Sequence, residues 1–138
     1  MEWYQRRVPG DGREYHVNTE SEVSWEDAQA WCKKRGANLA QPTDNLNTFM
    51  KEVAQRVPVK QGNVRVWLGA TDLAQEGEWR WLSGRPVDHF NTPWGENNPS
   101  NSGNLEHCME IQIETFSEVT LKINDNRCDA LQHFACEL

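Results

Sequence analysis

The chain has 138 residues, a net charge of −7 at neutral pH and a pI near 5.1. This length suits one domain with a buried core, so we expect a single domain over residues 1–138. The acidic balance argues against a nucleic-acid partner, and no apolar run is long enough to insert across a bilayer.

The first predicted elements are a short strand over residues 14–17 and a helix over residues 25–35. Ser24 is a good N-cap for this helix, acids occupy its first turn, bases occupy its last turn, and Gly36 follows. One face of the helix is apolar and should pack inward. Its members are Trp25, Ala28, Trp31 and Cys32.

A second helix is predicted after Thr43, with Pro58 ending it. Apolar residues recur along this segment at helical spacing, which indicates a face that packs on the core rather than a ligand site. This stripe consists of Leu46, Phe49, Met50, Val53, Ala54 and Val57.

The second half of the chain has the alternating pattern of strands, interrupted by one long irregular segment up to Gly103. A long insertion of this kind in a compact domain is usually functional. The predicted strands cover residues 64–70, 78–82, 108–113, 119–123 and 134–136.

Side-chain oxygens are concentrated in the irregular segment and shortly after it. Oxygen-rich segments suit a hard cation or a polyhydroxylated ligand, because both require several fixed oxygen partners. The candidate ligand residues are Asn98, Ser100, Asn101, Glu106, Asn124 and Asp125.

The chain has four cysteines, at positions 32, 108, 128 and 136, and three disulfide pairings are possible. Free thiols or a zinc site are the alternatives, but the spacing lacks the paired cysteines that structural zinc sites normally show. Two disulfides in an extracellular protein are the better interpretation. The first residues do not resemble a signal peptide, so we expect that a signal was removed or that the chain is cytosolic; the cysteines favour secretion.

Four motifs, in this order and spacing, make the whole chain resemble the C-type lectin-like domain family. They are Trp67-Leu68-Gly69, Glu76-Gly77-Glu78-Trp79-Arg80-Trp81, Glu106-His107-Cys108-Met109-Glu110 and Ile123-Asn124-Asp125. The resemblance implies an α+β fold with two helices, a mixed sheet that contains antiparallel strands, and a long loop region. It also implies two disulfides, Cys32–Cys136 and Cys108–Cys128.

In sugar-binding members of that family, a Ca²⁺ ion in the long loop binds two vicinal hydroxyls of the sugar. The resemblance places Asn98-Pro99-Ser100 at the position of the family's Glu-Pro-Asn or Gln-Pro-Asp tripeptide, whose proline usually follows a cis peptide bond. Asn98, Ser100, Glu106, Asn124 and Asp125 are therefore the expected carbohydrate-binding and metal-binding residues.

This chain departs from the family at the tripeptide, because neither Asn98 nor Ser100 carries a carboxylate. Since Ca²⁺ affinity follows the ligand charge count, we expect the ion to bind weakly or not at all. A second Ca²⁺ site of the family is also incomplete: Asp72 and Glu76 match two of its acids, but Asn101 and His107 stand where carboxylates are common.

The sequence thus predicts a secreted carbohydrate-binding lectin, with mannose or an N-acetylhexosamine as the favoured sugar because no aromatic residue directly follows the tripeptide. Metal-independent glycan binding, protein binding and a structural role in a biomineral matrix are the alternatives. No catalytic motif is present, so an enzyme is not expected. Glycans of microbial or cell-surface origin are the expected partners, and a homo-oligomer is left open.

Overall fold

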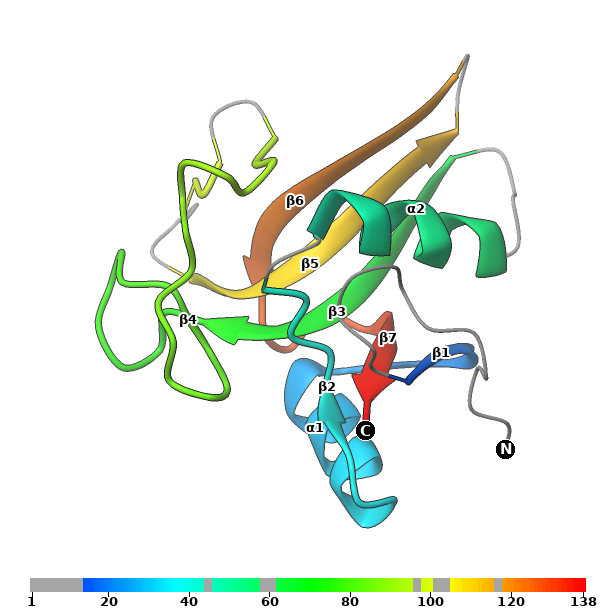
Figure 1. Cartoon of the computed structure of the whole chain (residues 1–138), viewed down its shortest axis with the longest axis horizontal. Helices are drawn as coiled ribbons and strands as arrows, with labels where there is room; N and C mark the ends of the chain where they lie inside the picture. Colours follow the sequence, from blue (N-terminus) through cyan, green and yellow to red (C-terminus); the bar gives the residue numbers. More distant parts are fainter. Residues whose placement is uncertain (1–13, 44–45, 58–61, 96–97, 101–104, 116–117) are drawn as a thin grey trace.

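A computed structural model describes residues 14–43, 46–57, 62–95, 98–100, 105–115 and 118–138. Two helices lie among the first strands along these residues, and five strands follow the second helix (Figure 1). The helices are α1 (Trp25–Lys34) and α2 (Leu46–Arg56). The strands are β1 (Tyr15–Val23), β2 (Asn38–Leu39), β3 (Asn63–Thr71), β4 (Arg80–Trp81), β5 (Glu106–Thr115), β6 (Val119–Arg127) and β7 (Gln132–Glu137).

The strands form one sheet in the order β1-β7-β3-β5-β6, with β2 paired to β7 and β4 paired to β3. All the named pairs are antiparallel except β3 and β7, which run parallel. The predicted α+β class with a mixed sheet is therefore confirmed. The pairing of β1 with β7 brings the beginning of the described chain beside its end, where the N–H of Leu138 donates to the carbonyl of Glu14.

Both helices begin and pack as their sequences predict. The Ser24 hydroxyl accepts a hydrogen bond from the N–H of Asp27 at 3.2 Å, which satisfies one of the free donors at the start of α1. Gly36 follows the helix with a φ of 75°, a conformation that glycine adopts without steric cost. The buried residues of α2 belong to the predicted stripe, namely Leu46, Phe49, Met50 and Val53.

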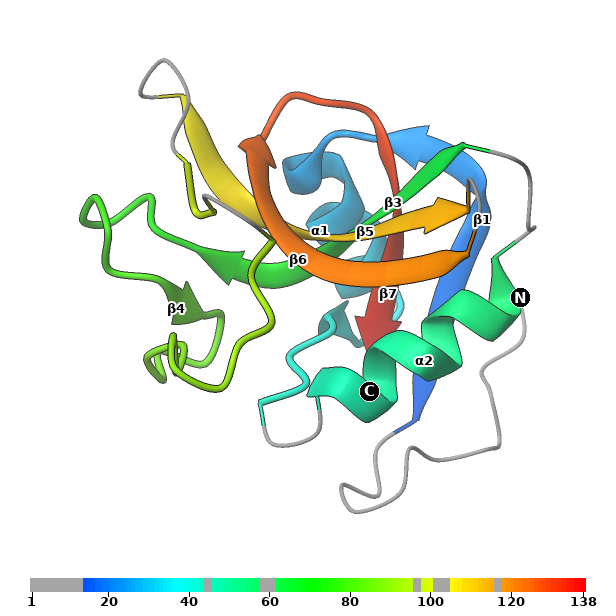
Figure 2. The ribbon, with the colours of Figure 1, turned by 90° about the horizontal axis from the view of Figure 1, so that it is seen from above.

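The sheet separates two hydrophobic clusters, and Figure 2 shows α1 and α2 on its opposite sides. The larger cluster joins α2 to one face of β5, through Met109, Ile111 and Ile113. The smaller cluster joins α1 to the other face, through Trp67, Cys108 and Phe134 among others. Because both faces of the central strands are covered, polar residues on either face of β5 can be buried.

The disulfides are Cys32–Cys136 and Cys108–Cys128, as the family resemblance implies, and they use all four cysteines. The first ties α1 to β7 across 104 residues of sequence. The second links the start of β5 to the residue that follows β6. In the described part of the chain, no helix has the length and apolar character that crossing a membrane would require.

The strand boundaries differ from the prediction, and the short strand β2 was not predicted. β1 extends to Val23, because its far end pairs with Gln132 after an irregularity in the register. The strand predicted over residues 78–82 is reduced to β4, whose two residues pair with Ala70 and Thr71 of β3. β6 continues past Ile123 to Arg127 along β5, so Asn124 and Asp125 are strand residues.

Candidate functional site

The irregular segment before β5 is attached to β6 immediately next to two of the predicted ligand residues. The N–H of Ile123 donates to the carbonyl of Pro93, and the N–H of Gly95 donates to the carbonyl of Ile123, both at 2.8 Å. These bonds flank a bridge between Trp94 and Ile123. Because Asn124 and Asp125 follow Ile123 directly, this attachment brings the tripeptide region to the edge strand that carries them.

Three of the predicted residues meet through hydrogen bonds made by Ser100. Its backbone N–H donates to Asp125 Oδ1 at 2.9 Å, and its hydroxyl donates to Glu106 Oε1 at 2.6 Å. The Asn98–Pro99 peptide bond is cis, as the family resemblance implies. One serine thus binds two carboxylates from the neighbouring strands β5 and β6.

Asn98 lies against the glycine that anchors the segment. Its backbone N–H donates to the carbonyl of Gly95 at 3.0 Å. A Cβ added to Gly95 would lie 3.0 Å from the side-chain nitrogen of Asn98. The position of the Asn98 amide therefore depends on the absence of a side chain at position 95.

The two carboxylates differ in exposure. Asp125 is fully buried, whereas Glu106 is partly exposed and Ser100 is exposed. A buried carboxylate requires hydrogen-bond donors or a cation, and the N–H of Ser100 is one such donor. Two carboxylates and a hydroxyl are hard oxygen donors, so this set fits a hard cation such as Ca²⁺ or the hydroxyls of a sugar.

Asn124 makes its side-chain contact away from Ser100. Its Nδ2 donates to Glu110 Oε2 at 3.0 Å, and Arg65 Nη1 donates to the same oxygen at 3.0 Å. The other oxygen of Glu110 accepts from Asn126 and Gln132, each at 2.9 Å. Burial raises the pKa of the Glu110 carboxyl, while these donors oppose the shift.

Sequence reasoning missed Glu110, and the strand pattern explains why. Along β5, polar residues at every second position alternate with Met109, Ile111 and Ile113, a pattern typical of a strand with one solvated face. Glu110 is nevertheless fully buried, because the smaller cluster covers that face. The available signal for a buried Glu110 was the amide-rich sequence of β6, which places Asn124 and Asn126 beside β5.

The remaining sequence predictions have mixed outcomes. Asp72, Glu76 and His107 lie together, next to the residue Glu106. Asn101 lies outside the described residues. Trp94 is half-buried and packs edge-on against Trp79, with ring centroids 5.4 Å apart, so it serves mainly as core.

Comparisons with known proteins identify the family. The family model described as the lectin C-type domain matches residues 21–138. The chain is 31% identical over 118 residues to salivary C-type lectin 2 of Aedes albopictus, a match that spans 83% of this chain and 77% of that relative. It is 29% identical over 133 residues to a C-type lectin mannose-binding isoform of Notechis scutatus scutatus, spanning 94% of this chain and 79% of the relative.

A solved structure agrees with these relatives. A Ca²⁺-dependent type II antifreeze protein, in its Ca²⁺-free form, superimposes with a TM-score of 0.74 at 28% identity. The superposition covers 100% of this chain and 98% of that protein. The chain therefore belongs to the C-type lectin domain family.

Proposed function

We propose that this protein is a glycan-binding lectin, and that its ligand site is formed by Asn98, Ser100, Glu106, Asn124 and Asp125. The observation that carries the proposal is the double hydrogen bond of Ser100 to Asp125 and Glu106. It joins the tripeptide to both neighbouring strands, so that several oxygen atoms face one point. A sugar with vicinal hydroxyls requires such an arrangement, because each hydroxyl both donates and accepts.

We further propose that Ca²⁺ binds weakly at the same residues. Glu106 and Asp125 would supply its two carboxylates, and Ser100 and the two asparagines would add neutral oxygens. The family membership and the Ca²⁺-dependent character of the similar antifreeze protein support an ion here. With only two anionic ligands, we expect a dissociation constant of about 10⁻⁴–10⁻³ M or weaker.

Mannose is the sugar that we favour, with N-acetylhexosamines next. The similar snake protein is named a mannose-binding isoform, which supports this choice. Secretion is supported by the two disulfides, which persist in oxidising compartments, and by the salivary lectins among the relatives. The natural partners would be glycans on microbial or cell surfaces, and the proposed role is binding rather than catalysis.

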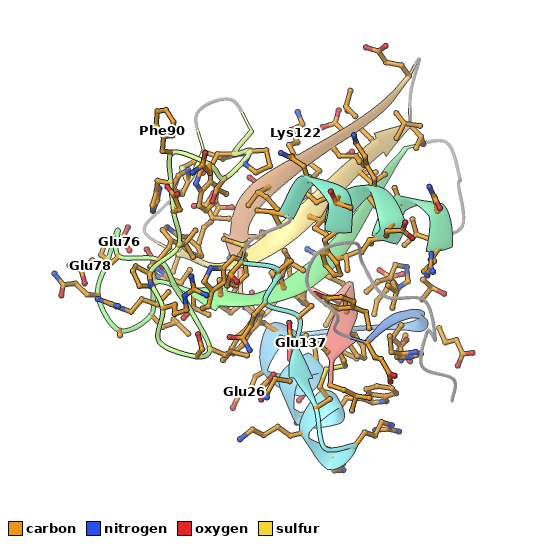
Figure 3. The ribbon with its side chains drawn as sticks, in the orientation of Figure 1. Glu26, Glu76, Glu78, Phe90, Lys122 and Glu137 are labelled. Carbon is orange, nitrogen blue, oxygen red and sulfur yellow. A yellow bond between two sulfur atoms is a disulfide. The ribbon has the colours of Figure 1, made fainter. Side chains whose placement is uncertain are left out.

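The test is a comparison of Glu106→Gln with Glu26→Gln. Both changes remove one carboxylate and keep the side-chain size, but Glu26 lies on α1, away from the loop region (Figure 3). We expect Glu106→Gln to abolish binding to mannose resin in Ca²⁺ and to leave the urea midpoint in EDTA nearly unchanged. Glu26→Gln should bind like the wild type.

Two outcomes separate the alternatives. Wild-type binding that survives EDTA but is lost in Glu106→Gln would mean that the site takes sugar without the ion. Equal binding by both variants, measured on a glycan array as well as on mannose resin, would refute the proposed site.

A further inference from the structure

A second group of potential ligands, Asp72, Glu76 and His107, lies where β3 ends and β5 begins. Asp72 Oδ1 is 2.9 Å from His107 Nδ1, and Glu76 Oε2 is 3.3 Å from the same nitrogen. One donor atom from each residue lies within 4.8 Å of the other two. An imidazole and two carboxylates therefore converge on one small volume (Glu76 is labelled in Figure 3).

Backbone hydrogen bonds hold the Asp72 side chain and join Asp72 to His107. Asp72 directly follows β3, and its N–H donates to the carbonyl of His107 at 3.1 Å. The Asp72 side chain is 2% exposed, and its Oδ2 accepts from the N–H of Gly77 at 3.0 Å. Its other oxygen is thereby held toward His107, while the Glu76 side chain, 49% exposed, closes the group from the solvent side.

The electrostatics of the group favour a bound cation. The donor oxygens of Asp72 and Glu76 lie within 4.8 Å of each other. Two carboxylates this close repel each other unless a positive charge lies between them. The buried position of Asp72 strengthens that repulsion, because water screens the pair less.

The donor types select the kind of cation. Ca²⁺ and Mg²⁺ prefer oxygen ligands, whereas imidazole nitrogen suits Zn²⁺ and other transition metals. Zinc bonds of about 2.0–2.2 Å in a tetrahedron place neighbouring donors about 3.3 Å apart. The 3.3 Å separation of Glu76 from the imidazole nitrogen matches this spacing, and the 2.9 Å hydrogen bond between His107 and Asp72 would have to open slightly to admit the ion.

We propose that Asp72, Glu76 and His107 form a binding site for a divalent transition metal ion such as Zn²⁺, distinct from the Ser100–Glu106–Asp125 site. The family resemblance implies a carboxylate at position 107, and the imidazole found there changes the preferred metal. Three protein ligands leave a fourth position for water or for an oxygen of a bound molecule. The ion would lie between the imidazole and the two carboxylates and would remove the repulsion between the carboxylates.

The experiment uses the full chain without a polyhistidine tag, dialysed against EDTA and then freed of chelator. Co²⁺ is titrated while its visible absorption is recorded, because a four- or five-coordinate site absorbs far more strongly than the hydrated ion. Zn²⁺ is then added in competition, and Ca²⁺ and Zn²⁺ are each titrated by calorimetry. We expect one Co²⁺ per chain, displaced by one Zn²⁺ and not by equimolar Ca²⁺.

Three variants locate the ion. Loss of a residue that only hydrogen-bonds to a metal ligand can weaken metal binding by roughly 100-fold, so His107→Asp should weaken Zn²⁺ binding by more than this. The added carboxylate should strengthen Ca²⁺ binding. Glu76→Gln alters a half-exposed side chain, so it tests the site even if the first variant folds poorly. His89→Gln removes an exposed imidazole on another loop and should bind Zn²⁺ as the wild type does.

Two results would overturn the proposal. One is the absence of a Co²⁺ spectrum together with Zn²⁺ binding no tighter than millimolar. The other is Zn²⁺ binding that neither His107→Asp nor Glu76→Gln weakens. In either case, the contacts of His107 with Asp72 and Glu76 would serve the structure alone. None of these measurements depends on sugar binding, so failure here leaves the lectin proposal untouched.

Discussion

Two glycines offer a matched pair of substitutions that separate the ligand site from the fold. A Cβ on Gly95 would lie 3.0 Å from Asn98 Nδ2 and 3.0 Å from Lys122 Cδ, both near the ends of flexible side chains. A Cβ on Gly69 would lie 2.7 Å from the backbone oxygen of Leu39. Neither glycine has a positive φ, so the two alanine variants differ mainly in what the new methyl group meets.

The expected free energies follow from these neighbours. Replacing glycine by alanine at a compatible φ stabilises a protein by about 0.4–1 kcal/mol through the unfolded state. At Gly69 the obstructing atom cannot move freely, since the glycine N–H and carbonyl also pair with Ala40 and Leu82. Overpacking of about 1–3 kcal/mol should dominate there, whereas Gly95→Ala should change the free energy of unfolding by less than about 1 kcal/mol.

The binding assay should show the reverse order. In Gly95→Ala the Asn98 side chain has to shift, so we expect sugar affinity to fall about 2–10-fold, the equivalent of one hydrogen bond. Gly69→Ala should bind normally per mole of folded protein. Urea denaturation and titration with mannose measure the two quantities. If Gly95→Ala bound sugar as tightly as the wild type while Asn98→Ala did not, the reasoning from the Gly95 contact would be refuted.

Three further predictions concern the frame of the site. Replacing Cys108 and Cys128 by alanine should lower the free energy of unfolding by about 3 kcal/mol, because their disulfide closes a loop of 20 residues. Replacing Cys32 and Cys136, whose disulfide joins α1 to β7 across 104 residues, should lower it by about 5 kcal/mol. Equal urea midpoints of the two variants would contradict this. The side-chain hydrogen bond from Asn91 lowers the pKa of Asp88, so this carboxylate stabilises the fold above its unfolded pKa and the benefit is lost as pH falls through the folded value. Asn91→Ala should raise the pKa of Asp88 in an NMR titration, and an unchanged value would reject the assignment. Asn98→Glu with Ser100→Asn should tighten Ca²⁺ and make mannose binding strictly metal-dependent; calorimetry showing micromolar Ca²⁺ binding by the wild type would contradict the charge argument.

Local signals made the two helices predictable. The cap at Ser24, the stop at Gly36 and the apolar stripe of α2 each depend on residues a few positions apart, and the structure confirms all three. The disulfide pairing followed from the family resemblance, because four cysteines alone allow three pairings. The convergence of Ser100 with Asp125 was expected from the same resemblance.

Features that depend on distant partners were not predictable from local pattern. The alternation around Trp79 and Trp81 indicates a strand of five residues, but β4 is short because only two of them find a partner in β3. Likewise, the alternating pattern of β5 indicates that Glu110 is solvated, because the pattern does not show that α1 and the smaller cluster cover this face of the sheet. Its four donors come from three strands, so no single segment of sequence contains the signal.

The hydrogen bonds of Ser100 bear directly on how much this site depends on metal. In a site with a carboxylate in the tripeptide, three acids crowd together and a cation is needed to hold them. Here the Ser100 N–H and hydroxyl each donate to one of the two remaining carboxylates, so the protein itself offsets part of the negative charge that a cation would otherwise offset. An incoming Ca²⁺ ion has to compete with the 2.6 Å hydrogen bond for Glu106 Oε1, which lowers its net gain in free energy. The same bond keeps Glu106 in place when the ion is absent, and a sugar hydroxyl can replace Ser100 as its donor. We therefore expect one serine to have two consequences, weak calcium binding and a site geometry that survives chelation.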